Sequence, residues 1–234
     1  MSSAIFLYIC TNKLIMAYKS NRKEDSRLEI VVNEFLDDYF ISKEFDKSKW
    51  VTDKETQLKG VDVRLTSERR GLNEAKVDIK SAVTCSTRYL PTFSLELSFI
   101  GRRGGEKTGW FLNDELETEY YLLIYPRSQK YYTEMELKDD IDYIDYYLVK
   151  KDDLMKFFES RGYDKEHLKK VSDDMREEYA KVGGDKLSWD SDSENFHFVL
   201  SGKLAEKPVN AVVKRQVYEK YAIMKGRIEK DGVH

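Results

Sequence analysis

The fold is decided by one stretch, GVDVRLTSERRGLNEAKVDIK, which runs from Gly60 to Lys80. Apolar and polar residues alternate near both of its ends, a pattern that is typical of half-buried strands. Its middle part is polar and ends at Gly71, as the connection of a hairpin does. The stretch therefore predicts a β-hairpin whose strands cover residues 61–65 and 76–80.

The register of this hairpin brings charged residues together. With Arg70 at the centre of the turn, Asp62 and Asp78 become cross-strand partners, with Cβ atoms about 4.5–5.5 Å apart. Lys80 shares their face because side chains alternate along a strand. Two opposed carboxylates repel each other, and either a divalent cation or the Lys80 ammonium would offset the repulsion. A solvated strand face with incidental charges explains the same pattern without a site, and a one-residue slip would change it.

Helices and further strands surround the hairpin. An apolar stripe at helical spacing predicts a helix over residues 28–40, with Ser26 as its N-cap. The order of elements is a helix, a run of strands and then helices, which indicates an α+β or α/β layout with a sheet covered by helices. The remaining expected strands are 50–52, 93–99, 118–125, 143–149, 196–200 and 210–213. The remaining expected helices are 152–160, 165–180 and 216–225, with a polar acidic loop over 183–195.

Composition excludes several classes of protein. The chain has 234 residues, with 40 Lys+Arg against 43 Asp+Glu, which rules out a polybasic protein that binds phosphate through net charge. Its 41% apolar content and three prolines exclude disordered and fibrous classes. The two cysteines and three histidines are scattered, so a disulfide framework or zinc ribbon is not expected. We expect a cytoplasmic protein in which any metal is bound by oxygen.

The N-terminal segment is apolar but does not predict a membrane span. Residues 4–17 are interrupted by Asn12 and Lys13, and a span needs about 20 apolar residues. The segment also lacks the basic start and cleavage site of a signal peptide. We expect no membrane partner and prefer Met16 as the biological start, with residues 1–25 as a leader. An added strand is the alternative.

The hairpin carries a family resemblance. Gly60-Val61-Asp62-Val63, followed by Lys76-Val77-Asp78-Ile79-Lys80, resembles the PD-(D/E)XK nuclease superfamily, also called the restriction-endonuclease-like fold. In that family an Asp on one strand and a D/E-x-K on the next form a metal site. Val61 stands where the motif often has proline, and Asp78 is an acid that the pattern allows. The segments that look like a phage- or mobile-element-type branch are Gln57–Gly60, Phe93–Leu97 and Gly109-Trp110.

The resemblance covers about residues 28–125 and implies a fold and a function. The fold is an α/β restriction-endonuclease-like mixed central sheet flanked by helices, with the nuclease-like core over residues 26–162. Residues 163–234 would form a helical and short-strand extension packed on this core. The function is Mg²⁺- or Mn²⁺-dependent hydrolysis of DNA phosphodiester bonds, and cleavage of both strands would favour a homodimer. The rival is a catalytically silent DNA-binding or regulatory protein with a nuclease fold.

The resemblance also implies residue roles. Asp62, Asp78 and the backbone carbonyl of Ile79 would ligate Mg²⁺. Lys80 would orient or help to deprotonate the attacking water and stabilise negative charge. Glu34, on the upstream helix, would hold a second metal ion or a water molecule on the metal. Its rivals on the same helix are Glu29, Asp37 and Asp38. Candidates for an outer shell are Gln57 and Glu96, although Glu96 is equally well explained as a solvent-exposed strand residue.

Two basic segments are candidates for DNA contact. Residues 101–108 nearly match a nucleotide-binding P-loop, but Glu106 stands where the final glycine is needed. A basic hairpin loop, with or without contact to a DNA backbone, explains the segment better. Residues 203–230 hold eight bases and three acids, whereas residues 114–145 hold ten acids and three bases and should repel phosphate. The candidate contacts are Arg102, Arg103, Lys107, Lys214 and Arg215.

Overall fold

The computed structural model of the protein describes residues 22–234. Helix α1 (Arg22–Leu36) continues through the π-helical turn η1 (Asp37–Ile41) into α2 (Ser42–Glu44). The predicted apolar stripe is buried along this helix, as Leu28, Val31, Val32, Phe35 and Leu36. The helix begins before Ser26, so the prediction of an N-cap there is wrong. The proposed start at Met16 and most of the expected leader lie outside the described residues.

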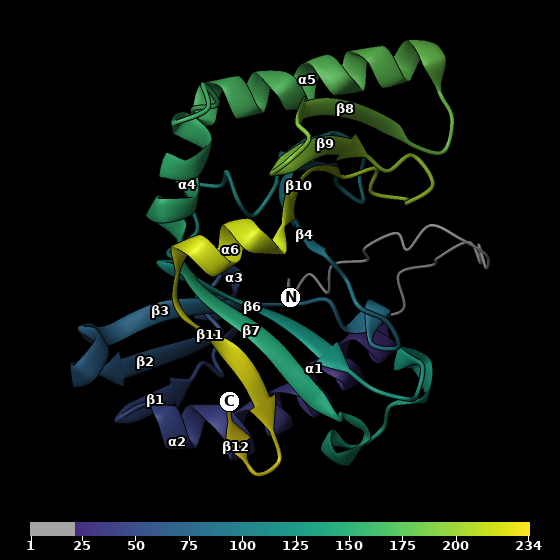
Figure 1. Ribbon diagram of the computed structural model, residues 1–234. Helices are drawn as coiled ribbons and strands as arrows, with labels where there is room; N and C mark the ends of the chain where they lie inside the picture. Colours follow the sequence, from purple (N-terminus) through teal and green to yellow (C-terminus); the bar gives the residue numbers. More distant parts are fainter. Residues whose placement is uncertain (1–21) are drawn as a thin grey trace.

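A seven-stranded mixed sheet forms the centre of the molecule (Figure 1). Its order is β1-β2-β3-β6-β7-β11-β12, and all neighbours are antiparallel except β3 and β6, which are parallel. The strands are β1 (Lys47–Trp50), β2 (Val63–Ser67), β3 (Leu72–Ser81), β6 (Tyr120–Arg127), β7 (Tyr143–Lys150), β11 (Ala222–Glu229) and β12 (Gly232–Val233). The expectation of a mixed sheet flanked by helices is confirmed at this level.

The hairpin has the predicted register. Val63 pairs with Val77 and Arg64 with Lys76, so the next pair outward would join Asp62 and Asp78. Strand β2 starts one residue after Asp62, whose backbone N–H donates to the Val77 carbonyl at 2.9 Å. The alternation of buried valines with polar residues therefore fixes which side chains share a face.

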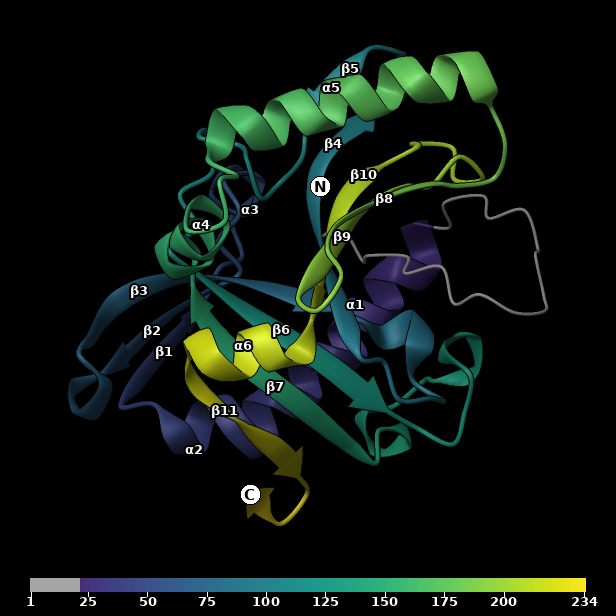
Figure 2. The same ribbon diagram turned by 45° about the horizontal axis from the view of Figure 1, so that its top comes forward.

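A second, antiparallel sheet packs beside the first. Its order is β5-β4-β10-β9-β8, and Figure 2 shows the long helix α5 lying across it. The strands are β4 (Thr92–Ile100), β5 (Glu106–Thr108), β8 (Leu187–Asp192), β9 (Phe196–Leu200) and β10 (Val209–Lys214). The predicted strands at 93–99, 196–200 and 210–213 are confirmed. Strand β8 lies inside the segment expected to be a loop, because its pairing with β9 overrides its polar composition.

The expected division at residue 162 does not separate the two sheets. Strand β10 pairs with β4, and β11 pairs with β7, so residues beyond 162 contribute strands to both sheets. Helix α6 (Arg215–Tyr221) ends where β11 begins, so the helix expected over 216–225 is wrong in its second half. The other helices are α3 (Lys54–Leu58), α4 (Lys151–Glu159) and α5 (Lys165–Val182), and the 3-10 turns are Glu68–Arg70, Val83–Cys85, Tyr132–Glu134 and Lys138–Asp140.

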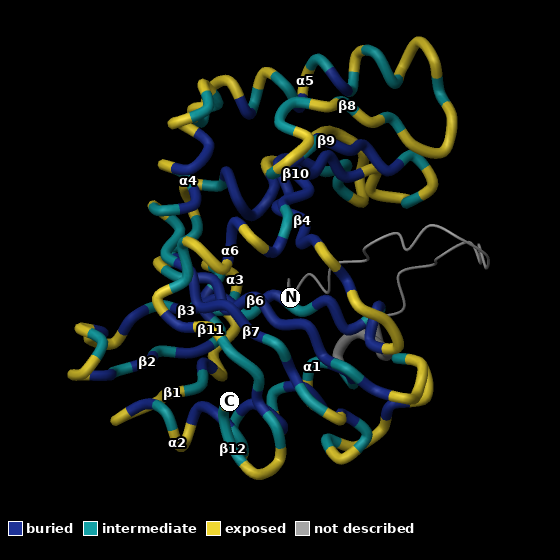
Figure 3. The backbone as a smooth tube through the Cα atoms, viewed as in Figure 1, coloured by how far each residue is buried: buried dark blue, intermediate teal, exposed yellow. Residues whose placement is uncertain are grey.

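Two apolar clusters cover the two faces of the central sheet, whose middle strands β6 and β7 are largely buried (Figure 3). Leu122 and Ile124 of β6 point toward the cluster that contains α1. Tyr121 and Leu123 point the other way, into the cluster shared with α4 and the second sheet. Residues with side chains on this second side therefore lie between the two sheets.

Two further findings concern membrane-spanning helices and the cysteines. Among the described residues, no helix combines the length and apolar character needed to cross a membrane. Cys85 is buried, and Cys10 lies outside the described residues.

Candidate metal centre

Asp78 and Lys80 meet on the inner side of the central sheet. They alternate along β3 with Val77 and Ile79, which pack toward α1, so their side chains face the second sheet. Asp78 is 2% exposed and Lys80 is 3% exposed. The Lys80 ammonium contacts Oδ1 of Asp78 at 2.7 Å. The two residues that the motif joins therefore form a buried ion pair.

Asp62 reaches the same place from the entry to β2. Gly60, with φ +73°, turns the chain out of α3, and its carbonyl accepts a hydrogen bond from the Thr118 hydroxyl at 2.7 Å. A Cβ at this glycine would lie 2.6 Å from that hydroxyl oxygen, so no larger residue fits. Oδ2 of Asp62 then accepts from the Ile79 amide at 2.8 Å. Ile79 thus contributes its N–H to the centre, and its role as a carbonyl ligand stays a prediction.

The environment of this centre shifts the pKa values of its acid and its base. Burial raises the pKa of Asp78 to about 7; the nearby Asp62 carboxylate raises it further, and Lys80 opposes the rise. Burial acts to lower the pKa of Lys80, but the charges of Asp78 and Asp62 outweigh it, and the net shift is upward. Lys80 therefore stays a cation at neutral pH.

Glu96 approaches from the other sheet. It lies on β4, is 9% exposed, and the charges of Glu96 and Lys80 interact. Burial raises the pKa of Glu96 to about 8, Lys80 opposes the rise, Glu206 adds to it, and a backbone hydrogen bond from Trp110 opposes it. The interpretation of Glu96 as a solvent-exposed strand residue is wrong, because both faces of β4 are covered.

A tight turn at Gly109 holds Glu96 in place. The Gly109 amide donates to the Leu97 carbonyl at 2.8 Å, and the Phe111 amide donates to the Glu96 carbonyl at 3.1 Å. A Cβ at Gly109 would lie 2.4 Å from the Glu96 carbonyl oxygen, so only glycine allows this approach. The turn also brings the Trp110 ring to 5.2 Å from the Lys80 ammonium.

Sequence reasoning missed three neighbours of the centre. Trp110 covers Lys80, and Tyr121 is the register partner of Asp78 across the parallel β3–β6 pair. Burial and the Asp78 charge raise the pKa of Tyr121. Lys151, the first residue of α4, interacts with the Asp78 charge, and burial lowers its pKa. Tyr121 could have been predicted as a neighbour only from a parallel pairing of the strands 76–80 and 118–125. No local sequence pattern indicates that Trp110 and Lys151 lie near the centre.

Asp62 and Asp78 offer carboxylate oxygens of the kind that a divalent cation takes, but within residues 22–234 the group of three ligand atoms that lie within 4.8 Å of one another is Glu229, Asp231 and His234. The carboxyl groups of Asp78 and Glu96 both interact with the Lys80 ammonium, and they also interact with the charges of Lys151 and Arg176 respectively. Oδ2 of Asp78 is buried and accepts no hydrogen bond from an N–H or hydroxyl group of the described residues; when Asp78 is protonated, its carboxyl group can hydrogen-bond to Asp62 instead. A buried carboxylate oxygen without a partner is costly, and Mg²⁺ takes oxygen ligands of this kind.

The structure does not bring Glu34 to this centre. Glu34 is exposed on α1, which packs on the side of the sheet away from Asp78. The other acidic candidates of this helix do not lie at the centre either. Asp37 accepts from the Trp50 ring N–H at 2.8 Å, and Asp38 pairs with Lys138. Glu29 lies on the same helix as Glu34. Gln57 donates to the Val51 carbonyl at 2.9 Å, which holds α3 against the strand before it.

The candidate DNA contacts separate into exposed and buried residues. Arg102, Arg103 and Lys107 are exposed on the β4–β5 hairpin, and Lys214 is half-buried at the end of β10. Arg215 is 5% exposed; its guanidinium donates to the Leu90 carbonyl at 2.6 Å and to Asp145 at 3.0 Å. The predicted phosphate contact by Arg215 has no support in this structure, because its guanidinium is buried and bonded to the Leu90 carbonyl and to Asp145, which Arg227 also contacts.

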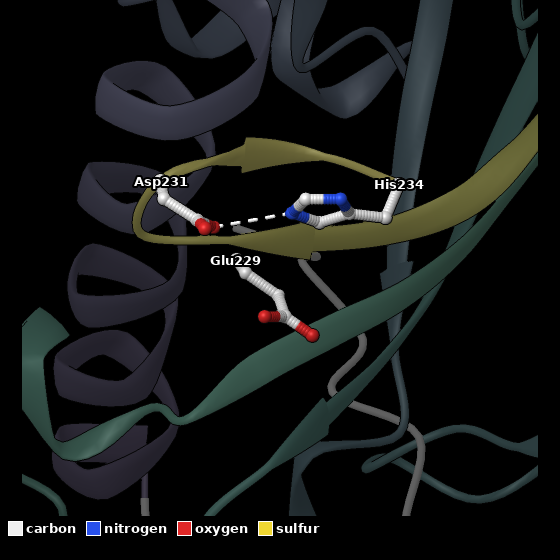
Figure 4. A group of neighbouring side chains, drawn as sticks. All are labelled: Glu229, Asp231 and His234. Carbon is white, nitrogen blue, oxygen red and sulfur yellow. Dashed lines mark hydrogen bonds and ion pairs between the residues drawn. The ribbon is translucent and has the colours of Figure 1, made fainter.

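A second group of metal-type ligands lies at the C-terminus. Figure 4 shows Asp231 and His234 facing each other across the β11–β12 turn, with Glu229 beside them. The Asp231 carboxylate and the His234 ring satisfy one another at 3.1 Å, and both residues are exposed. None of the three side chains is a buried atom without a partner, in contrast to Oδ2 of Asp78.

Comparison of the chain with protein-family models, curated proteins and solved structures gave no match.

Proposed function

We propose that the protein is a Mg²⁺-dependent DNA nuclease of the restriction-endonuclease-like fold. The observation that carries the proposal is the convergence of Asp62, Asp78 and Lys80: the Lys80 ammonium contacts Asp78 at 2.7 Å, Asp62 accepts from the Ile79 amide at 2.8 Å, and the Asp62 charge acts on the buried Asp78 carboxyl group. A helix followed by an antiparallel hairpin and a strand parallel to β3 also supports it. The residue pattern and its convergence in space point to the same chemistry.

Asp62, Asp78 and Lys80 have different roles in the proposed hydrolysis of a phosphodiester bond. Asp62 and Asp78 would hold the ion, which supplies Lewis-acid stabilisation of a phosphoryl group when bound. Lys80 keeps its proton, so it orients the attacking water and stabilises negative charge on the phosphate rather than acting as a base. The Trp110 ring lies 5.2 Å from the ammonium, in the turn after β5, and Glu96 of the second sheet interacts with its charge.

A plasmid assay tests the proposal. The purified chain is incubated with supercoiled DNA in Mg²⁺, Mn²⁺ or EDTA, and nicked and linear products are measured. We expect cleavage with either ion, none in EDTA, and a loss of at least about 100-fold in Asp78→Asn and Lys80→Met. Asp190→Asn, at an exposed position of β8, is the matched control and should cleave normally. No cleavage by the unmodified chain on duplex or single-stranded DNA would refute the proposal.

One observation favours a second candidate, a DNA-binding protein without turnover. Lys80 contacts Asp78 directly, and both side chains are almost fully buried, so the pair is closed to a substrate as it stands. In that case the chain would bind DNA with the same affinity in Mg²⁺ and in EDTA. Asp78→Asn would then change stability but not DNA affinity, which an anisotropy titration measures.

A further inference from the structure

Three cations lie on the outer strands of the central sheet, on the same side as the candidate metal centre. Lys47 and Lys49 come from β1 and Arg64 comes from β2; we call these three residues the basic row. Lys49 pairs with Arg64, and Lys47 pairs with Thr66. The alternating residues Trp50 and Val63 pack toward α1. The basic row therefore points to the opposite side, the side of Asp62 and Asp78.

The basic row is not neutralised by the protein. Lys47 and Lys49 are exposed and Arg64 is half-buried, and none of them takes part in an ion pair within residues 22–234. Lys76, the next residue across the sheet from Arg64, behaves differently, because its ammonium contacts Glu117 at 2.6 Å. Charge is thus left uncompensated on β1 and β2 and is compensated on β3.

Protection of the sheet edge does not account for the whole row. Strand β1 is at the edge of the sheet, where lysines discourage pairing with another chain. Arg64 is on β2, which is paired on both sides, so protection of the sheet edge does not explain its charge. A guanidinium presents several N–H donors in a planar fork that matches phosphate oxygens.

The spacing of the row suits a nucleic-acid backbone. Arg64 is two residues from Asp62 along the chain, which corresponds to about 7 Å. Lys49 is one strand further out, about 5 Å more. The two displacements are at right angles, so Lys49 is about 9 Å from Asp62. One DNA strand carries a charge at every ~3.4 Å of the helix axis, so the row spans the length of more than one phosphate.

We propose that the basic row binds the phosphate backbone of DNA on one side of the phosphodiester that is held at Asp62 and Asp78. The inference rests on the proposed nuclease function and adds the direction in which the substrate leaves the centre. The contacts are to phosphate, so they position the DNA and carry no sequence information.

The salt dependence of DNA binding tests the row. A fluorescein-labelled 20-bp duplex is titrated with the full chain in EDTA at several salt concentrations. Each phosphate contact contributes about 0.9 to the slope of log K against log salt, so Lys47→Gln, Lys49→Gln and Arg64→Gln together should lower the slope by about 2.7. At moderate salt the affinity should fall by roughly tenfold or more.

A matched triple variant removes the same charge elsewhere. Lys181→Gln, Lys186→Gln and Lys220→Gln change exposed lysines of α5, the following loop and α6, and should keep the original slope. Arg64→Lys retains the charge and should keep the slope while losing the planar fork. Thermal unfolding of each variant checks that the fold is retained.

The outcomes separate this inference from the proposed function. Equal slopes in the two triple variants, or no duplex binding by the unmodified chain, would overturn the basic row. If the plasmid is cleaved in Mg²⁺ while the two triple variants have equal slopes, the proposed nuclease function is supported and the inference about the basic row is refuted. A selective loss of slope in the basic-row variant supports the inference, and reduced plasmid cleavage by the same variant adds to that support.

Discussion

Replacing Glu96 by glutamine should make the protein more stable at alkaline pH. The pKa of Glu96 rises from 4.5 to about 8 because its carboxyl group is buried. Below pH 4.5 the group is protonated in both the folded and the unfolded chain. Between pH 4.5 and 8 only the unfolded chain releases the proton, so the free energy of unfolding falls; above pH 8 the loss is constant.

The size of this loss follows from the shift in pKa. A difference of about 3.5 units at 1.36 kcal/mol each corresponds to about 5 kcal/mol at pH 9, and relaxation around the charge makes this an upper bound. Glutamine has nearly the same shape and no charge to desolvate. We therefore expect Glu96→Gln to match the unmodified chain near pH 4.5 and to exceed its free energy of unfolding by about 2–5 kcal/mol at pH 9.

Urea unfolding in EDTA at pH 4.5, 7 and 9 measures this difference. The matched control is Glu159→Gln, at an exposed position of α4 without an ion pair in the described structure. It should not alter the pH dependence. A Glu96→Gln curve parallel to that of the unmodified chain across this range would refute the electrostatic description of the centre.

Three further substitutions test the packing and charge around the centre. Gly109→Ala forces a Cβ to 2.4 Å from the Glu96 carbonyl oxygen, so we expect the free energy of unfolding in urea to fall by several kcal/mol. The control is Gly104→Ala, at an open position whose φ is +76°, and it should cost only about 1–2 kcal/mol. Arg215→Met removes one of the two arginines that pair with Asp145 and leaves Arg227 as the other, so it should cost about 1–3 kcal/mol by the same measurement; an effect no larger than that of exposed Arg88→Met would contradict it. Lys80→Met leaves Asp78 without its ammonium, so its pKa should rise above 7, and the variant should lose stability relative to the unmodified chain as pH increases through 7. A carboxyl resonance of Asp78 that titrates unchanged in this variant would argue against the ion pair.

The sequence alone predicts those helices and strands whose apolar and polar residues alternate with a local period. The alternation of Val63, Val77 and their polar neighbours sets the hairpin register, because a one-residue slip would expose both valines. The apolar stripe of α1 was equally clear. Residues 222–225 belong to the helix predicted over 216–225, but in the structure they begin β11 and pair with β7, and this tertiary pairing outweighs local propensity.

The candidate site could be predicted only in part for the same reason. Period-2 geometry places Asp78 and Lys80 on one face, and the turn centre adds Asp62. Trp110 and Lys151 arrive from a loop and a helix whose positions depend on the packing of the whole molecule. Arg215 looked like a surface base in a basic segment, but the buried Asp145 draws it inward.

We propose that Asp62 and Asp78 hold a divalent cation. Isothermal titration of the chain with Mn²⁺, monitored in parallel by the electron paramagnetic resonance of free Mn²⁺, tests this proposal. We expect Mn²⁺ binding that is lost in Asp62→Asn and in Asp78→Asn and is retained in Glu229→Gln, which alters the C-terminal group of ligands. Unchanged Mn²⁺ binding in both aspartate variants, or its loss only in Glu229→Gln, would refute the proposal.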